Sequence, residues 1–262
     1  MNRAMRTAAT GMLAQQTQVD TIANNIANVN TAAFKKNRVN FRELLYHTMR
    51  EPGATTAGAQ MVPTGLQVGS GTEVSSSIKL MMQGDLEPTG SEFDIGIQGE
   101  GFFKIDLGNG EFRYTRDGAF RKDANGDIVT VDGFKLADQI NIPADALNLS
   151  IGQDGTVSVI LAGDPLPSNV GQIQLTRFAN PSGLKAEGQN MFSVTGSSGP
   201  PQELIAGQDG TGFLRHRFLE RSNVFVVDEL ISLIQAQRNY EVNSRTIRVG
   251  DEMLQQVSNL IR

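Results

Sequence analysis

Few residues in this chain have the type and spacing that chemistry requires. There are two histidines, His47 and His216, and no cysteine. Neither histidine has a partner at H-x-x-x-H or H-x-H spacing, so a zinc site would need carboxylates clustered around one ring. Glu92 and Asp94 would share one face of a strand, but a carboxylate pair without a pocket is a weak signal. We therefore predict no catalytic residue, no metal site and no cofactor.

Two glycine-containing motifs approach ligand-binding patterns and then depart from them. Gly99-Glu100-Gly101 opens a strand-like run, whereas a phosphate cradle needs a helix N-terminus behind its glycines. Asp123 to Asp127 begins like a calcium loop, but Ile128 stands at the glycine position and Phe134 at the position of the final glutamate. The chain also has no Walker sequence and no G-x-S-x-G elbow. These observations predict a protein that is not an enzyme and has no small-molecule substrate.

Composition narrows the class of protein further. The net charge of −5 argues against nonspecific binding to nucleic acid. No run of eighteen apolar residues is present, so no membrane-spanning helix is predicted. The basic start, Met1 to Arg6, is not followed by an apolar stretch, and we predict no cleaved signal peptide. Taken alone, that last feature favours a cytoplasmic protein.

The elements that must carry any functional surface are two long amphipathic helices, one near each end of the chain. In each helix, apolar residues recur every seven positions, which is typical of a coiled-coil seam. The first helix has the rows Met5, Met12, Val19, Ile26 and Ala8, Gln15, Ile22, Val29. The second has the row Val226, Leu233, Tyr240, Ile247, Leu254, Ile261, widened by Leu230, Ile234, Ala236 and Val257.

The two helical stripes match each other, and we predict that the terminal helices pair as a coiled coil. Either helix alone would be poorly buried and marginal in water. The rest of the first helix carries amides such as Gln16, Asn24 and Asn28 in place of charges, which suits packing against several protein neighbours. We therefore expect the ends to be mobile in a monomer and ordered in an assembly.

Between the helices, the pattern changes to an arm followed by β structure. Residues 37–65 are expected to form an extended linker or arm, and its part from 50 to 65 is rich in Gly, Pro, Ala and Thr. Residues 66–219 contain short apolar runs separated by turn dipeptides that favour type I′ hairpins. Those dipeptides are Asn109-Gly110, Asp117-Gly118, Asn125-Gly126, Asp132-Gly133 and Asp154-Gly155.

The predicted fold class is therefore α+β. The N-terminal helical segment, residues 1–36, and the C-terminal one, residues 220–262, form a coiled-coil domain. It carries a mainly antiparallel β domain, residues 66–219, inserted between the two helices.

Several separate motifs resemble those of the flagellar rod and hook protein family, and they occur in the same order along essentially the whole chain. The first lie in Ala9 to Gln16, Ile22 to Thr31 and Phe34-Lys35-Lys36. The others lie in Gly99 to Phe103, Tyr114 to Phe120, Leu219 to Val224 and Leu233 to Ser244. Within that family, the chain resembles the members that build the distal rod, both in its length and in its segment from Tyr46 to Gly65.

The resemblance implies a structural subunit of the distal rod, a helical tube that transmits torque from motor to hook and encloses the export channel. Terminal helices would form its inner layer and β domains its outer layer. Three alternatives stay open. One is a proximal rod or hook subunit of the same family, the second is a soluble β-domain binding module, and the third, an enzyme, has no supporting constellation.

The same resemblance implies roles for particular residues. The helical rows named above would hold helices and subunits together, and the C-terminal helix would line the channel with Arg238, Arg245 and Arg248. The arm, including Pro52, Met61, Val62 and Pro63, would wedge between neighbouring subunits. The implied location is the basal-body rod that spans the periplasm, reached by flagellar export without a cleaved signal, which overturns the cytoplasmic preference.

The implied partners are other copies of the chain, proximal rod proteins, the hook protein, and the ring proteins at the peptidoglycan and outer membrane. The rod cap and the export apparatus would be partners during assembly. No nucleic acid is expected among them.

Overall fold

The computed structural model describes residues 2–52, 64–162 and 166–260, and the chain divides into two compact units. The first unit contains residues 1–27, 37–78 and 225–262, and the second contains residues 28–36 and 79–224. Each unit is therefore assembled from segments that are distant in the sequence. The mainly antiparallel α+β class predicted from the sequence is confirmed.

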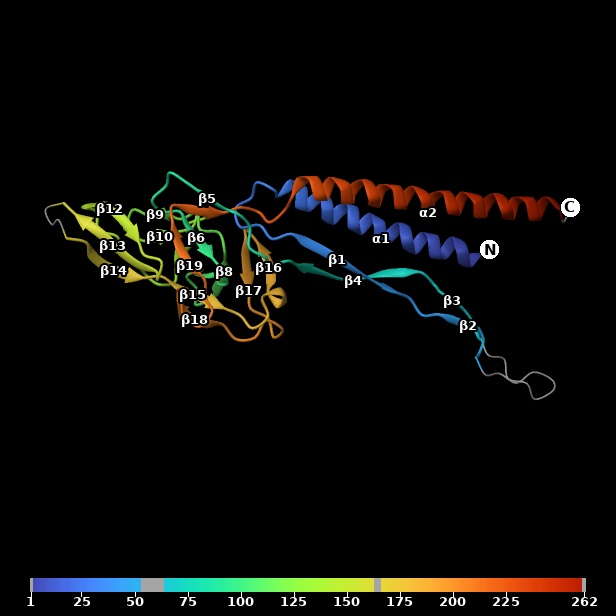
Figure 1. Ribbon diagram of the computed structural model, residues 1–262, viewed down its shortest axis with the longest axis horizontal. Coiled ribbons are helices and arrows are strands. Elements are labelled where there is room, and N and C mark those ends of the chain that lie inside the picture. The colour runs from blue at the N-terminus through green and yellow to red at the C-terminus, as the bar shows by residue number, and fades with distance from the viewer. Residues whose placement is uncertain (1, 53–63, 163–165, 261–262) are drawn as a thin grey trace. The chain divides into compact units, whose positions relative to one another are not determined.

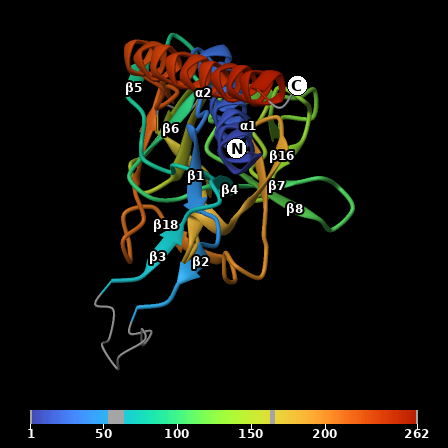
Figure 2. The ribbon, with the colours of Figure 1, turned by 90° about the vertical axis from the view of Figure 1, so that its right-hand side faces the viewer.

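In the described residues of the first unit, the elements are two long helices and four strands. The helices are α1 (Asn2–Ala27) and α2 (Val226–Leu260), and the strands are β1 (Asn37–Glu43), β2 (His47–Arg50), β3 (Leu66–Val68) and β4 (Thr72–Lys79). β1 pairs with β4, and β2 pairs antiparallel with β3, with His47 opposite Val68. The helix α1 lies between α2 and the β1–β4 pair (Figures 1 and 2).

The loop before β4 is fastened to α1. The backbone N–H of Thr72 donates to Thr10 Oγ1 over 3.4 Å. Gly71 has a φ of +114°, and a Cβ added there would lie 2.1 Å from the same Thr10 oxygen. Glycine is therefore required at this position by both the backbone conformation and the close approach.

The helix α1 ends at Ala27, whereas the sequence analysis extended the N-terminal helical segment to residue 36. The reason is local. The carbonyl of Asn28 accepts from the backbone N–H of Thr31 over 3.2 Å, and the Asn28 side chain accepts from the Thr31 hydroxyl over 3.2 Å. Asparagine side chains that bond nearby groups favour turns over helix. Val29, predicted as a helix packing residue, therefore follows the end of α1 and belongs to the second unit.

The second unit is built from short antiparallel strands. Its strands are β5 (Leu86–Pro88), β6 (Ile95–Gln98), β7 (Phe103–Asp106), β8 (Phe112–Thr115), β9 (Arg121–Lys122), β10 (Ile128–Val129), β11 (Lys135–Leu136), β12 (Ala146–Ile151), β13 (Thr156–Leu161), β14 (Ser168–Gln172), β15 (Gln174–Arg177), β16 (Lys185–Gly188), β17 (Met191–Ser193), β18 (Gln202–Ile205), β19 (Phe213–His216) and β20 (Phe218–Glu220), with one 3-10 turn, η1 (Pro181–Gly183).

These strands form one large sheet and several small ones. The seven-stranded sheet has the order β16-β17-β8-β7-β11-β10-β9, and a three-stranded sheet has the order β12-β13-β14. β15–β18, β19–β6 and β20–β5 are two-stranded. The core gathers alternate residues of many strands, among them Ile95, Ile105, Val157 and Leu175. In β13, the buried Val157 and Val159 are two residues apart. Alternate residues of a strand point to the same face, so apolar runs of period two contribute to this core.

Four of the five predicted turn dipeptides place glycine at positive φ. Gly110, Gly126, Gly133 and Gly155 have φ between +74° and +91°. Gly118 is different because its φ is not in that region, and a Cβ there would lie only 1.7 Å from the carbonyl oxygen of Ile95. The Gly118 carbonyl also accepts from the Ile95 N–H over 3.0 Å. Asp117-Gly118 is therefore a point of close backbone approach, and the prediction of a hairpin turn there was wrong.

Candidate functional site

The two terminal helices form an antiparallel pair within the first unit. A Cβ added to Gly250 would lie 3.1 Å from Met5 Cγ, and one added to Gly11 would lie 2.8 Å from Asn243 Nδ2. Near the other end, the Asn25 amide donates to Glu229 Oε2 over 3.2 Å. Residue numbers therefore rise along α1 as they fall along α2 (Figure 1). The winding of this pair as a coiled coil stays a prediction.

The buried positions of the helix pair are smaller and more polar than the predicted apolar rows. Ala8, Ala14, Ile22, Asn25, Glu229 and Ala236 are the buried side chains of α1 and α2. Among the residues of the predicted rows, Ala8, Ile22 and Ala236 are buried, and Met5, Met12, Val19, Ile26, Leu233, Ile247 and Leu254 are half-buried. Val226, Leu230 and Tyr240 are exposed in the single chain. Ile261 lies outside the described residues.

The Asn25–Glu229 pair is a feature that the sequence analysis missed. Both side chains are 1% exposed. Asn25 Nδ2 also donates to the carbonyl of Asn37 over 3.0 Å, and Asn25 Oδ1 accepts from the Asn37 N–H over 2.9 Å. One amide thus joins α1 to the start of β1 and to the first turn of α2. The signal in the sequence was Asn25 on the buried face of an otherwise periodic helix, where a polar residue can set register.

The surface of α2 that faces away from these buried positions is rich in apolar residues. Val227, Ile231, Ile234, Val242, Val249 and Met253 are exposed to between 41% and 68%. The three- and four-residue spacing of these side chains places them on one helical face. Arg238 and Arg245 fall in the same series, and these two and Arg248 are exposed. We call Val227, Ile231, Ile234, Arg238, Val242, Arg245, Val249 and Met253 the α2 stripe.

The strand pair β2–β3 and its neighbours also expose apolar side chains. Leu45 is 89% exposed, and Tyr46, Met49 and Leu66 are each more than half exposed. The segment from Tyr46 to Gly65, whose conformation the sequence left open, begins with strand β2. Pro52 is exposed, whereas Met61, Val62 and Pro63 lie outside the described residues. Within the described residues, the predicted arm therefore contains β1, which pairs with β4, and β2, which pairs with β3.

A second missed feature is a buried ion cluster in the second unit. Glu220 accepts from Lys35 Nζ over 2.6 Å and from Arg116 Nε over 2.8 Å, and all three side chains are at most 4% exposed. Glu220 also accepts from the N–H of Gly84 over 2.8 Å. Lys35 Nζ donates in addition to the carbonyl of Met82 over 2.8 Å. We call Lys35, Arg116 and Glu220 the buried triad.

The segments around the buried triad are bonded to one another as well. Arg116 donates to the carbonyls of Gly99 and Gly101 over 3.0 Å each. Asn223 accepts from the N–H of Lys36 over 2.7 Å and donates to the carbonyl of Leu80 over 2.8 Å. Four of the motifs that carry the family resemblance, at Lys35, Gly99, Arg116 and Glu220, therefore meet at one place.

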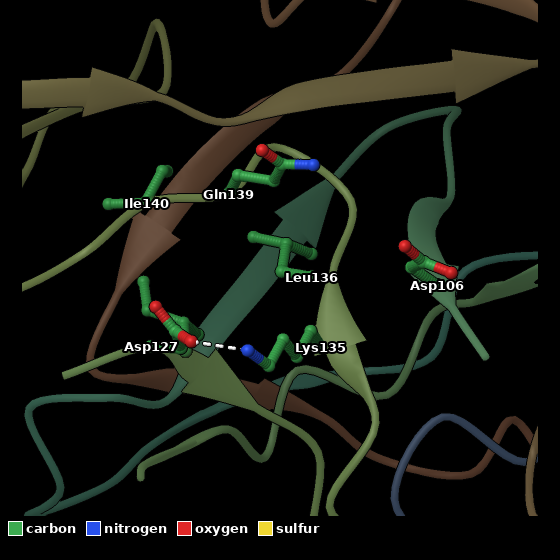
Figure 3. A pocket seen from close by; sticks show the side chains of 7 residues that line it. Asp106, Asp127, Lys135, Leu136, Gln139 and Ile140 are labelled. Atoms are coloured by element: carbon green, nitrogen blue, oxygen red, sulfur yellow. Dashed lines mark hydrogen bonds and ion pairs between the residues drawn. The ribbon is translucent and has the colours of Figure 1, made fainter. Parts of the chain in front are cut away.

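One hollow of the second unit is open and polar. It has a volume of about 450 Å³ and is lined by Asp106, Asp127, Ile128, Lys135, Leu136, Gln139 and Ile140. Figure 3 shows Asp127 and Lys135 facing each other, joined by an ion pair of 2.6 Å, with Asp106 apart from them. Hydrogen bonding to Lys135 and Asn141 lowers the pKa of Asp127, and the bond to Asp127 raises the pKa of Lys135. Asp127 and Lys135 are thus matched with each other.

The carboxylates and histidines considered in the sequence do not form a joint site. Glu92 Oε1 accepts from Arg217 over 2.9 Å at the surface, whereas Asp94 is buried. His216 Nε2 contacts the carbonyl of Glu92 over 2.8 Å. In the described part of the chain, no three His, Cys, Asp or Glu side chains gather as a metal site would require. Within the same residues, no helix is long and apolar enough to span a membrane.

Three family models match this chain in sequence order. Residues 5–35 match the flagella basal body rod protein, residues 96–159 match the flagellar hook protein FlgE/F/G D1 domain, and residues 215–260 match the flagellar basal body rod FlgEFG protein C-terminal region. The matched segments include most of α1, nearly all of β6, the strands β7 to β12, and the whole of α2.

Full-length relatives agree with these models. The flagellar basal-body rod protein FlgG of Buchnera aphidicola subsp. Schizaphis graminum is 44% identical over 96% of both chains. That of Caulobacter vibrioides is 45% identical over 98% of this chain and 99% of its own. The flagellar hook-basal body complex protein FlhP of Bacillus subtilis is 33% identical over 97% of both. The chain belongs to the family of flagellar basal-body rod proteins.

Proposed function

We propose that this chain is a structural subunit of the distal rod of the flagellum, a tube of many copies that transmits torque from motor to hook. The observation that carries this proposal is identity of 44–45% along nearly the whole chain to rod proteins named FlgG. The sequence identity to FlhP, 33%, is lower. A role in a different part of the hook–basal body is therefore the weaker candidate for the function of this chain. The protein acts in the basal body.

The α2 stripe supports assembly into such a tube. Its six apolar side chains are between 41% and 68% exposed, and burying one side chain of this kind fully contributes roughly 1.5–3 kcal/mol. Val226, Leu230 and Tyr240, which are also exposed, add to the surface that other copies would cover. The half-buried α1–α2 pair would then gain order on assembly, since binding stabilises the state that binds.

The arginines of the α2 stripe suggest how the inner surface is arranged. In a tube with α2 innermost, Arg238, Arg245 and Arg248 would face the export channel, as we expect from the family. Arg238 and Arg245 alternate with apolar residues along the α2 stripe, so some part of this face would contact neighbouring helices. The wall that the channel presents would then be mixed, with arginine heads in water and their stems along apolar side chains.

The β2–β3 ribbon is the candidate for an inter-subunit wedge. Its exposed Leu45, Tyr46, Met49 and Leu66 are suited to packing between neighbouring copies. Such a wedge would stiffen the tube into a straight shaft. The proposed partners are other copies of this chain, the proximal rod, the hook, the ring proteins, and the cap and export apparatus during assembly.

The experiment that tests the proposal is electron cryomicroscopy of intact hook–basal bodies from the native cell. We expect density for this chain in the straight segment inside the rings, with α1 and α2 toward the axis. Density at the membrane-proximal end or in the curved hook would reassign the part while keeping the family. Particles that contain no density for this chain would overturn the proposal and favour a soluble binding module.

A further inference from the structure

We propose that the buried triad is a late-closing clasp of the second unit. In this proposal, Lys35, Arg116 and Glu220 come together only after the β core has formed, and Glu220 is the residue that closes them. The segments 33–36 and 218–223 therefore become ordered last. The inference concerns folding of the single chain and deepens the proposed function, in which the export apparatus is a partner of the subunit during assembly.

Glu220 is suited to close the clasp because it touches every other segment. Its carboxylate accepts from Lys35, from Arg116 and from the N–H of Gly84. Its own carbonyl accepts from the N–H of Ala33 over 2.8 Å. A chain in which residue 220 is not yet in place therefore leaves the 33–36 segment, the 82–85 loop and Arg116 without their shared partner.

Charge makes early closure unfavourable. The buried triad holds two cations and one carboxylate, all nearly inaccessible to water. Removing charges from water is costly unless the geometry and the remaining hydrogen bonds are complete. Carbonyls of Met82, Gly99 and Gly101 supply those remaining bonds, and they do so only once β6, β7 and the loops beside them are in position.

The long sequence separation between the members of the buried triad also makes early closure unfavourable. Lys35 and Glu220 are 185 residues apart, and Arg116 and Glu220 are 104 apart. Closing long loops costs conformational entropy before any contact repays it. In contrast, the hairpin β12–β13 joins neighbouring residues, with Ile151 opposite Val157. The core strands can therefore pair before the clasp is complete.

The experiment measures folding and unfolding rates of the purified full-length protein with Glu220→Gln, which keeps the shape and removes the charge. The control is Glu203→Gln, because Glu203 forms an ion pair with Lys104 of 2.7 Å but is exposed at the surface of the same unit. Hydrogen exchange is read at the amides of Ala33, Lys36 and Gly84, and compared with amides of β12 and β13. If Glu220→Gln does not fold, Glu220→Asp is measured in its place.

For Glu220→Gln, we expect unfolding to become about 10-fold faster or more and refolding to change less than about 2-fold, as for contacts that form after the transition state. Exchange at Ala33, Lys36 and Gly84 should rise far more than in β12 and β13. Glu203→Gln should change neither. Three outcomes would overturn the clasp. In the first, the whole loss of stability appears as slower refolding; in the second, all amides lose protection from exchange equally; in the third, neither the folding rate nor the unfolding rate changes. None of these measurements depends on rod assembly.

Discussion

At the residue scale, the folded protein disfavours the protonated, charged form of Lys35. Burial is the main cause that lowers the pKa of Lys35 from 10.5 to about 8, and nearby Arg116 lowers it further, against the opposing attraction of Glu220. The amine donates hydrogen bonds to Glu220 and to the Met82 carbonyl, and a neutral amine still has two N–H groups with which to make them. Loss of the Lys35 proton therefore leaves these bonds possible while removing the buried excess charge.

The first prediction concerns stability at alkaline pH. Because the folded pKa of Lys35 lies below the unfolded value, the unfolded chain binds more protons between about pH 8 and pH 10.5, and stability rises with pH there. Lys35→Met should flatten this rise relative to the native chain, by on the order of 1–3 kcal/mol across the window. Urea unfolding of both proteins from pH 7 to 9.5 checks it. Parallel pH curves for the two would refute it.

The second prediction at this scale concerns Gly118. A Cβ there would lie 1.7 Å from the Ile95 carbonyl oxygen, which belongs to the backbone of a core strand and cannot move alone. Gly118→Ala should destabilise the second unit by about 3 kcal/mol or more. Gly90→Ala is the matched control, because no heavy atom lies within 4 Å of the added Cβ. The melting temperatures of the two variants are compared by thermal unfolding. Equal melting temperatures would contradict the prediction, because they would show that the contact between the added Cβ and the Ile95 carbonyl is relieved at little cost in stability.

At the scale of elements, α1 and α2 pair through small and polar side chains and leave much apolar surface open. Gly11 and Gly250 allow the helices to approach, and the Asn25–Glu229 pair fixes one register. An interface of this kind is weak by burial alone. The helix pair is therefore suited to become fully stable only when the α2 stripe is covered by other copies.

The third prediction tests the helix pair in the cell. Ile22 is 2% exposed, so Ile22→Asp would bury a carboxylate without a cation, at a cost of about 3 kcal/mol or more. Leu254→Asp tests the half-buried end of α2. Both variants should abolish swimming at the assembly stage while the second unit stays folded, as judged by its hydrogen exchange.

A matched control for these helix variants is Val131→Asp, which places the same charge at a side chain of the second unit that is 70% exposed. Swimming of that strain should be retained. Normal swimming of the Ile22→Asp and Leu254→Asp strains would sink the proposed packing role of the two helices.

At the scale of the whole molecule, the two units differ in net charge. Residues of the first unit carry nine Lys and Arg and nine Asp and Glu, whereas the second carries fourteen and nineteen, so the net charge of −5 lies on the second unit. The first unit instead offers apolar surface on α2 and on the β2–β3 ribbon. Association between copies is thus expected to depend mainly on the first unit.

The fourth prediction concerns the arm. Deleting residues 50–65 removes β2–β3 pairing at Arg50 opposite Leu66 and everything beyond it. If residues 50–65 of the arm wedge between neighbours, rods of the deleted chain should assemble but bend, which electron microscopy of isolated basal bodies would reveal. A chain with a Gly/Ser segment of equal length in place of 50–65 separates loss of length from loss of side chains. Straight rods from the deletion would contradict the wedge.

Much of this architecture could be predicted from the sequence because its signals are local. Seven-residue periodicity located both helices, and Asn-Gly or Asp-Gly dipeptides located four turns whose glycines have positive φ. Motifs in order along the chain indicated the family, which the comparisons confirmed. Each of these signals is contained within a few residues, so no knowledge of distant neighbours was needed.

Only the tertiary structure decided which distant residues meet. A Cβ at Gly118 would meet the Ile95 carbonyl oxygen, a close approach that the Asp117-Gly118 dipeptide does not reveal. Lys35, Arg116 and Glu220 look like surface charges in the sequence, yet they are buried together. Burial of a charge depends on partners supplied by segments more than one hundred residues away, and that information exists only once the chain has folded.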